Sequence, residues 1–342
     1  MSILKPINPN ANEDAVRILN LLKKYTDDST KSICGAFDHL YYRTDGNYNN
    51  YDCLSKKYGD LGLYSTYYLH RGDGTFDYEE SNEKIIEHYK EGAVILVHNA
   101  NEWADDMCAE IYENEEDRKD FIMNFDAENP NRNEKAYNFY LKCRESWADG
   151  LEALKNAGVT AMYRPFVEMN NKYFFGSFTE SEEGIESFKR IWRQLVDYLI
   201  NERNLDNILI TYSPSSCAND GRSDLYFPGS DYVDVVAPTA YSMPWVHKDA
   251  PEEFYEKAWH YSRHAGLCDK PFGYAELGVD LNKDEPNKGK GEWRNLLDLL
   301  EKCPKMGFFC LWSGDCSPVA ESGLHADEFM TMKNWAFLKD IK

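Results

Sequence analysis

The sequence lacks the features that mark several common classes of protein. No run of roughly 18 uncharged apolar residues is present, so no segment qualifies as a transmembrane helix. Cys-x-x-Cys pairs and Cys/His clusters with zinc spacing are absent, and nine cysteines in a chain of 342 residues do not form a disulfide scaffold. Cys310 and Cys316 are expected to be either a satellite disulfide or two buried thiols. A Gly-x-Gly-x-x-Gly segment after the first apolar run is also missing, which argues against an open sheet that binds a dinucleotide.

Positive charge is scarce in this chain. Its 38 Lys and Arg residues face 59 Asp and Glu residues, which gives a formal net charge of −21, and no basic run stands out. A polyanion would be repelled by such a protein, so we expect no nucleic-acid partner. We expect no membrane partner either, because no apolar run is long enough to span a bilayer. A neutral or weakly charged substrate fits this balance better than an acidic one.

The first residues bear on where the protein works. The segment from Met1 to Pro6 has no apolar stretch of the kind found in secretory leaders. We therefore expect an extracellular protein if a leader was removed, and a cytoplasmic protein otherwise.

Short apolar runs alternate with longer amphipathic segments along the whole chain, and no linker, repeat or low-complexity segment divides it. This order predicts an α/β fold with a parallel sheet, and eight such units fit a closed (β/α)8 TIM barrel better than an open sheet. We expect one domain over residues 1–342, and a monomer. The eight runs are Ser32–Phe37, Leu61–Tyr68, Ala93–Val97, Ala161–Val167, Ile208–Tyr212, Val233–Ala237, Phe272–Ala275 and Phe308–Trp312. The clearest helical segments are Asn12–Tyr25, Ala136–Ala157, Gly184–Glu202, Pro251–Ala265 and Gly291–Lys302.

The fourth run ends on a glutamate with polar and aromatic neighbours. Strand alternation would place Arg164, Phe166 and Glu168 on one face. The carboxyl ends of barrel strands are where such folds carry catalytic groups. A solvated glutamate at the rim is the alternative for Glu168 taken alone. Its neighbours favour a carbohydrate site instead: Arg164, Asn170, Tyr173 and Phe174.

The seventh run also stops at a single glutamate, Glu276, which a Gly-containing turn follows. In a barrel, Glu168 and Glu276 would face each other across the mouth. Glycoside hydrolysis needs such a pair, because one carboxyl group protonates the leaving oxygen while the other attacks the anomeric carbon. We therefore expect Glu168 to be the general acid/base and Glu276 to be the nucleophile.

Other strand ends carry side chains suited to binding a sugar. Tyr241, after the sixth run, would hydrogen-bond the Glu276 carboxylate, although a core tyrosine is the alternative. Trp312 would offer a stacking platform at the end of the eighth run, and a structural role is equally open. His98 ends the third run on the predicted catalytic face, and Trp103 follows it. A lone histidine in such a place is more often a packed residue than a ligand.

Three segments resemble glycoside hydrolase family 26, whose best-known members are endo-β-1,4-mannanases. The family's Arg-Pro-x-His-Glu-x-Asn-Gly-x-Trp-Phe segment is matched by Arg164–Phe174. Its Tyr-Pro-Gly-Asp-x-Tyr-Val-Asp segment is matched by Phe227–Asp234, which leads to Tyr241, and its Glu-Phe-Gly segment by Glu276–Gly278. The opening Asn8–Ala11 also looks like the family's start, so the resemblance spans nearly the whole chain.

The resemblance implies the roles already expected for Glu168 and Glu276, in a retaining mechanism. It implies no metal and no organic cofactor. It also places five side chains around the sugar near the cleavage point: His98, Arg164, Tyr173, Tyr241 and Trp312.

The chain departs from the family pattern beside these residues. Val167 stands where the family has a histidine before the acid/base, and Val97 replaces a tryptophan before His98. Asn171 replaces a glycine, and Tyr173 replaces a tryptophan. An isopropyl group cannot form the hydrogen bonds of an imidazole. We therefore expect the pocket for the reacting sugar to be altered, which keeps substrates other than mannan open.

The expected function is that of a retaining endo-β-glycanase acting on a plant or algal cell-wall polysaccharide, with β-1,4-mannan or glucomannan first. Mixed-linkage β-glucan and β-1,3-xylan are alternatives within the same fold and mechanism. A non-catalytic glycan-binding barrel is an alternative from another class, which Val167 motivates and the intact glutamate pair opposes. A metal-dependent hydrolase would need clustered His and Asp at strand ends, and the eight histidines are scattered.

Overall fold

The computed structural model describes most of the chain. The described residues are 3–28, 30–40, 49–99, 103–114, 118–171, 174, 179–215, 223–242, 269–281, 286, 288–294, 296 and 306–342. Tyr173 and the predicted helix Pro251–Ala265 lie outside them.

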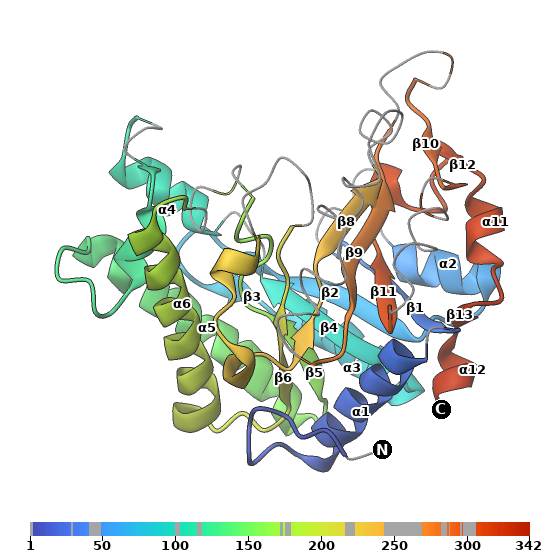
Figure 1. The fold of residues 1–342 in the computed structure, drawn as a ribbon, viewed down its shortest axis with the longest axis horizontal. Coiled ribbons are helices and arrows are strands. Elements are labelled where there is room, and N and C mark those ends of the chain that lie inside the picture. The colour runs from blue at the N-terminus through green and yellow to red at the C-terminus, as the bar shows by residue number, and fades with distance from the viewer. Residues whose placement is uncertain are drawn as a thin grey trace.

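Parallel strands form a sheet that curls into a barrel (Figure 1). Their order is β7-β6-β5-β4-β2-β1-β11-β9-β8, and each neighbouring pair is parallel. Isolated bridges join Val236 to Phe272 and Ser215 to Thr239, so the two ends of this path meet and the sheet closes. The strands are β1 Ser32–Phe37, β2 Leu63–His70, β4 Val94–Asn99, β5 Ala161–Arg164, β6 Ile208–Tyr212, β7 Val235–Val236, β8 Thr239–Ser242, β9 Gly273–Val279 and β11 Phe308–Leu311.

Each of the eight predicted runs contributes to this barrel, which confirms the predicted (β/α)8 fold. The sixth run continues further than predicted, because β7 is followed after Ala237 and Pro238 by β8. Proline has no N–H to donate to a ladder, and the pairing changes from β6 to β9 across this point.

Three predicted helices are found close to their expected bounds: α1 Glu13–Asp27, α5 Glu134–Asn156 and α6 Glu182–Asp197. Each begins after a side chain that accepts from the first free N–H groups, namely Asn12, Asn133 and Ser181. A π-helical turn, Tyr198–Glu202, continues α6. The apolar pattern did not single out α2 Asn50–Tyr58, α3 Glu79–Glu91 or α4 Trp103–Ile111. In Figure 1, α4, α5 and α6 lie together on one side of the barrel.

The predicted helix Gly291–Lys302 is wrong at its start. Gly291–Glu292 forms strand β10, which pairs with β12 Gly323–Leu324 in a separate two-stranded sheet. The remaining elements are short: β3 Phe76–Asp77, β13 Trp335–Ala336, α11 Ala326–Met330, α12 Leu338–Ile341 and the 3-10 turns Phe121–Phe125, Ser223–Tyr226, Ser230–Tyr232 and Gly314–Cys316.

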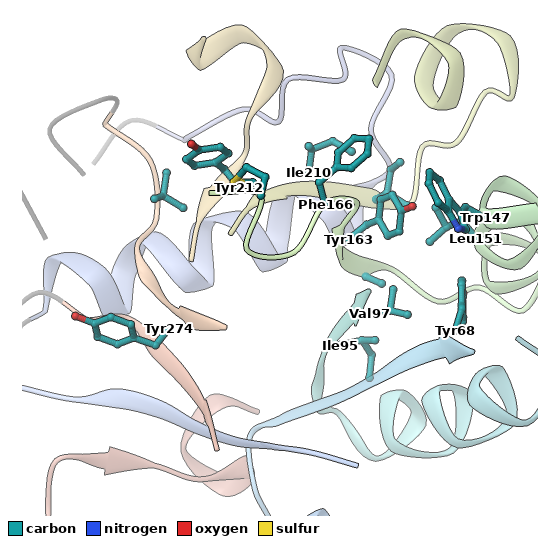
Figure 2. Packing of buried hydrophobic residues seen from close by; sticks show 14 of the residues in the cluster. Tyr68, Ile95, Val97, Trp147, Leu151, Tyr163, Phe166, Ile210, Tyr212 and Tyr274 are labelled. Atoms are coloured by element: carbon teal, nitrogen blue, oxygen red, sulfur yellow. The ribbon is translucent and has the colours of Figure 1, made fainter. Parts of the chain in front are cut away.

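The apolar core has two layers, one inside the barrel and one outside it. The inner layer joins strand residues such as Ile33, Leu63 and Leu96 to the buried face of α1, which therefore covers the amino-terminal end of the barrel. The outer layer lies between the strands and the surrounding helices, and Figure 2 shows Tyr163, Ile210 and Trp147 within it. Burying these large side chains is the main favourable contribution to folding.

A buried carboxyl group ties the amino-terminal segment to the barrel. Asp234 is fully buried and accepts hydrogen bonds from the N–H groups of Ile7, at 2.7 Å, and Ile210, at 2.9 Å. Burial raises its pKa to about 6, while these two hydrogen bonds act in the opposite direction. Asp234 thus has a structural role inside the second family-like segment.

None of the helices that the structure describes has the length and apolar character needed to cross a bilayer. Cys310 and Cys316 are free thiols, so the disulfide alternative is wrong for this pair.

Candidate active site

Glu168 stands on a turn that follows β5. Its N–H donates to the Ser213 carbonyl at 2.9 Å, and its own carbonyl accepts from the Asn171 N–H at 2.8 Å. Its backbone has φ of 49°, the left-handed region that side-chain-bearing residues rarely adopt. These contacts present the Glu168 carboxyl group at the carboxyl end of the barrel, where it is 9% exposed.

The prediction that Arg164, Phe166 and Glu168 share one strand face is wrong. Strand β5 ends at Arg164, because Pro165 cannot continue the ladder. The Arg164 side chain points into the barrel, whereas Phe166 belongs to the outer layer beside Tyr163 and Ile210 (Figure 2).

Both oxygens of the Glu168 carboxyl group accept hydrogen bonds. The Thr239 hydroxyl donates to Oε1, and the Asn171 amide donates to Oε2 at 2.8 Å. Thr239 begins β8 and is fully buried. The acid/base candidate is therefore held by donors from two different segments.

Glu276 lies on β9 at an irregularity in the strand. Tyr274 lies opposite Phe309 of β11, and Leu277 lies opposite Leu311, so β9 advances by three residues while β11 advances by two. Tyr274 and Leu277 both belong to the outer layer. The extra residue is a bulge that turns the Glu276 side chain into the barrel, which strict alternation would not do.

The Glu276 carboxyl group is also held at both oxygens. Arg164 Nη2 donates to Oε1 at 3.0 Å, and the Tyr241 hydroxyl donates to Oε2 at 2.8 Å. Arg164 is fully buried and donates from Nε to the Ser213 hydroxyl at 2.9 Å. Burial raises the pKa of Tyr241 well above its usual value, and the charge of Glu276 adds to this, so the phenol remains a donor.

Thr239 of β8 lies between the two glutamates. Thr239 donates to Glu168 and lies opposite Glu276 in the register of β8 and β9. Burial raises the pKa of Glu276 to about 7; the charge of Arg164 opposes this, and the negative charge of Glu168 adds to it. The hydrogen bonds from Tyr241 and Arg164 favour the ionised carboxylate. One member of the pair is thus surrounded by donors suited to an anion, next to a second acid.

Aromatic rings line the barrel beside these acids. His98 of β4 lies opposite Arg164 in the sheet and stacks on Phe37, with ring centroids 5.2 Å apart. Trp312 also stacks on Phe37, with ring centroids 4.3 Å apart, and is only partly buried. Burial and the Arg164 charge hold the pKa of His98 well below its usual value, so the imidazole is neutral. A neutral imidazole can hydrogen-bond a sugar hydroxyl, and an indole can stack on the face of a sugar ring.

Two of the predicted sugar-binding residues are buried and make other contacts. Trp103 is 4% exposed and packs among rings of the outer layer, 5.0 Å from Trp147 and 5.3 Å from Phe125. Asn170 is fully buried and exchanges two hydrogen bonds with the backbone of Ser215. We therefore leave both out of the proposed sugar-binding set. Phe174 is partly exposed, and its N–H donates to the Asn171 carbonyl at 3.0 Å.

Ser213, Thr239 and Phe37 complete the site and were not predicted. Thr239 precedes Tyr241 by two residues on the same strand, so alternation was a usable signal for it. Ser213 follows the last residue of β6, and Phe37 is the last residue of β1.

The structure offers no place for a metal among the residues it describes, since no three His, Cys, Asp or Glu side chains there are grouped to hold one. The site that the structure describes consists of two carboxyl groups, their hydrogen-bond donors and aromatic rings.

The model of glycosyl hydrolase family 26 matches residues 7–258 of this chain. The chain belongs to glycosyl hydrolase family 26. The match includes Glu168 and Tyr241, while Glu276 lies beyond its end.

Sequence relatives of this family 26 chain include two bacterial enzymes. A mannan endo-1,4-beta-mannosidase of Bacillus subtilis is 32% identical over 182 residues, which cover 52% of this chain and 45% of that protein. The mannan endo-1,4-beta-mannosidase A and B of Caldalkalibacillus mannanilyticus is 32% identical over 179 residues, covering 51% of this chain and 32% of that protein. The matched segment is thus less than half the length of each relative.

Solved structures share the fold over nearly the whole chain. The Bacillus subtilis mannanase man26 has a TM-score of 0.72 at 21% identity, covering 98% of this chain and 95% of that one. A ruminal GH26 endo-beta-1,4-mannanase has a TM-score of 0.72 at 16% identity, covering 98% and 70%. At these identities the likeness shows that the family 26 chain is a (β/α)8 barrel, including the segment that carries Glu276.

Proposed function

We propose that the protein is a retaining endo-β-glycanase with β-1,4-mannan or glucomannan as its substrate. The observation that carries the proposal is a pair of glutamates inside the barrel, Glu168 and Glu276, each held by its own pair of donors and close enough for the charge of Glu168 to act on Glu276. Membership of the family and the mannan endo-1,4-beta-mannosidase relatives support the substrate.

In the first step of the proposed reaction, a Glu276 oxygen attacks the anomeric carbon. The bond from that carbon to the leaving oxygen breaks, and the leaving oxygen takes the proton of Glu168, which forms a glycosyl–enzyme ester and frees one part of the polysaccharide. In the second step, Glu168 takes a proton from water, the water oxygen attacks the anomeric carbon, and Glu276 leaves. Two displacements return the original configuration.

The neighbouring residues fit this scheme as supports for the nucleophile and the sugar. Arg164 and Tyr241 orient Glu276 and stabilise its ionised form, which is the reactive one. His98 and Trp312 both stack on Phe37, and they supply a hydrogen-bonding ring and a stacking ring. In our scheme these two contact the sugar at the point of cleavage.

Mixed-linkage β-glucan and β-1,3-xylan remain second candidates because of one observation. Val167, which precedes Glu168, is 5% exposed and apolar where the family pattern has a histidine. A lost polar contact changes which hydroxyl arrangement the pocket accepts.

The test is a panel of galactomannan, glucomannan, mixed-linkage β-glucan, β-1,3-xylan and β-1,4-xylan, with reducing ends and product anomers measured. We expect fastest release from the mannans and a first-formed product with the β configuration. Glu168→Ala and Glu276→Ala should each lose nearly all activity. Added azide should restore turnover of an activated glycoside as a β-azide in Glu168→Ala and as an α-azide in Glu276→Ala. Binding of a polymer without any cleavage would favour the non-catalytic barrel.

A further inference from the structure

Asn171 contacts Glu168 at two separate points. Its backbone N–H donates to the Glu168 carbonyl at 2.8 Å, which closes the turn that holds Glu168 at a positive φ. Its side-chain amide donates to Glu168 Oε2, also at 2.8 Å. The first contact needs only a backbone, so any residue can make it. The second depends on the asparagine side chain, which stands where the family pattern has a glycine.

The other carboxyl oxygen is occupied from the opposite side. Thr239 donates its hydroxyl to Glu168 Oε1, and its own backbone is fixed by a 2.9 Å hydrogen bond from its N–H to the Pro214 carbonyl. With a donor on each oxygen, the carboxyl group has little freedom to rotate. Removing the Asn171 amide leaves Oε2 without this fixed donor and lets the group turn about the Thr239 contact.

We propose that Asn171 is a positioning residue for the acid/base Glu168, an inference that rests on the proposed function. Its amide stabilises the carboxylate that forms when Glu168 gives its proton to the leaving oxygen, because a hydrogen bond to the charged form favours that form. It also aims the same carboxylate at water in the second step. The asparagine thus supports proton transfer in a pocket where Val167 supplies no polar group.

A positioning role for Asn171 and a purely structural role predict different effects on substrates with different leaving groups. Proton transfer from Glu168 is needed when the leaving group is a sugar hydroxyl, which leaves poorly as an anion. It is hardly needed for 2,4-dinitrophenolate, which leaves without a proton. Loss of the Asn171 amide should therefore slow the first step for a mannan oligosaccharide and spare it for an activated aryl glycoside.

The experiment compares Asn171→Gly with the wild-type protein on mannohexaose and on 2,4-dinitrophenyl β-mannobioside. Asn171→Gly keeps the backbone contact and removes only the side chain. We expect kcat on mannohexaose to fall by about tenfold with KM nearly unchanged, the size expected for one hydrogen bond to a charged group. The burst rate on the aryl glycoside, which reports the first step, should change by less than about twofold. Asn171→Ala should show the same selective loss.

Asn204→Gly is the matched control, because Asn204 is an exposed asparagine at φ of 53° that a glycine replaces without strain. We expect it to leave both rates unchanged. Equal losses on the two substrates in folded Asn171→Gly and Asn171→Ala would contradict the positioning role, and so would no loss on either. A wild-type protein that cuts neither substrate would overturn the proposed function, and the inference with it.

Discussion

Tyr241 donates its hydroxyl to Glu276 Oε2 at 2.8 Å from the neighbouring strand, on the oxygen that Arg164 does not bind. The contact depends on Gly278, which lies opposite Tyr241 in the register of β8 and β9. A Cβ at Gly278 would come within 3.0 Å of the Tyr241 ring and 3.1 Å of Cys316. Gly278, two residues after Glu276, therefore makes room for the ring that holds Glu276.

Tyr241→Phe should shift the pH dependence of kcat/KM. Glu276 must be ionised to attack, and its pKa of about 7 places the acidic limb of the wild-type profile near that pH. The hydrogen bond from Tyr241 lowers this pKa, so its removal raises the pKa, and the acidic limb should move to higher pH by about one unit, with a loss of roughly tenfold or more below pH 7. The measurement is kcat/KM on mannohexaose from pH 5 to pH 9.

Tyr25→Phe is the control for that shift. Tyr25 lies on α1 at the opposite end of the barrel and donates its hydroxyl to the Asp340 carbonyl at 3.1 Å. Tyr25→Phe loses a comparable hydrogen bond, and Tyr25 contacts neither Glu168 nor Glu276 in the hydrogen bonds described above. A profile for Tyr241→Phe that coincides with that of Tyr25→Phe would show that the phenol does not tune Glu276.

Val167→His should increase cleavage of mannan. The substitution returns a hydrogen-bonding ring to a position that is now apolar and 5% exposed, directly before Glu168. We expect a several-fold higher kcat/KM on mannohexaose together with a cost in stability of about 1–3 kcal/mol, because a larger side chain enters a packed place. Val167→Leu adds volume without polarity and should only destabilise. Unchanged or lower activity in Val167→His would contradict the view that Val167 limits the pocket.

Asp234→Asn should destabilise the fold and remove part of its pH dependence. Asparagine offers one acceptor oxygen where Asp234 serves two buried N–H groups, so we expect a loss of about 1–3 kcal/mol in urea denaturation at pH 7. The pKa of Asp234 is about 6 in the folded protein and 3.8 in its ordinary state. Its protonated form is thus favoured by folding, and this contribution to stability is full below about pH 4 and is lost as the pH rises through 6.

Asp231→Asn is the matched control for Asp234→Asn, since Asp231 is an exposed residue three positions earlier. We expect its stability and its pH dependence to follow the wild-type protein within a few tenths of a kcal/mol. If the two variants behave alike, Asp234 does not anchor the amino-terminal segment.

The chain order of apolar runs was enough to predict the barrel and the runs that lead to Glu168 and Glu276. Glu168, however, stands four residues beyond the end of β5, and β9 continues past Glu276 to Val279. Apolar periodicity is a local property, so β1, β4, β6 and the helices α5 and α6 could be predicted directly. The helices α2 and α3, of 9 and 13 residues against 23 in α5, were not singled out from the sequence.

The local sequence pattern could not predict which side chains contact Glu168 and Glu276. The bulge at Glu276 exists because β9 pairs with β11, and the turn at Glu168 exists because Ser213 accepts its N–H from another strand. Similarly, Trp103 and Trp312 each come after a barrel strand along the chain, yet Trp103 packs into the outer core and Trp312 stacks on Phe37 in the site.

The amino-acid sequence thus determined that the chain folds into a barrel and that Glu168 and Glu276 follow two of its apolar runs. The pairing of strands far apart in sequence decided which side chains face the barrel and which donors, such as Thr239 and Tyr241, hold each acid. Hydrogen bonds depend on tenths of an ångström and on angle. Such distances are set by register and closure of the whole sheet, which no single segment encodes.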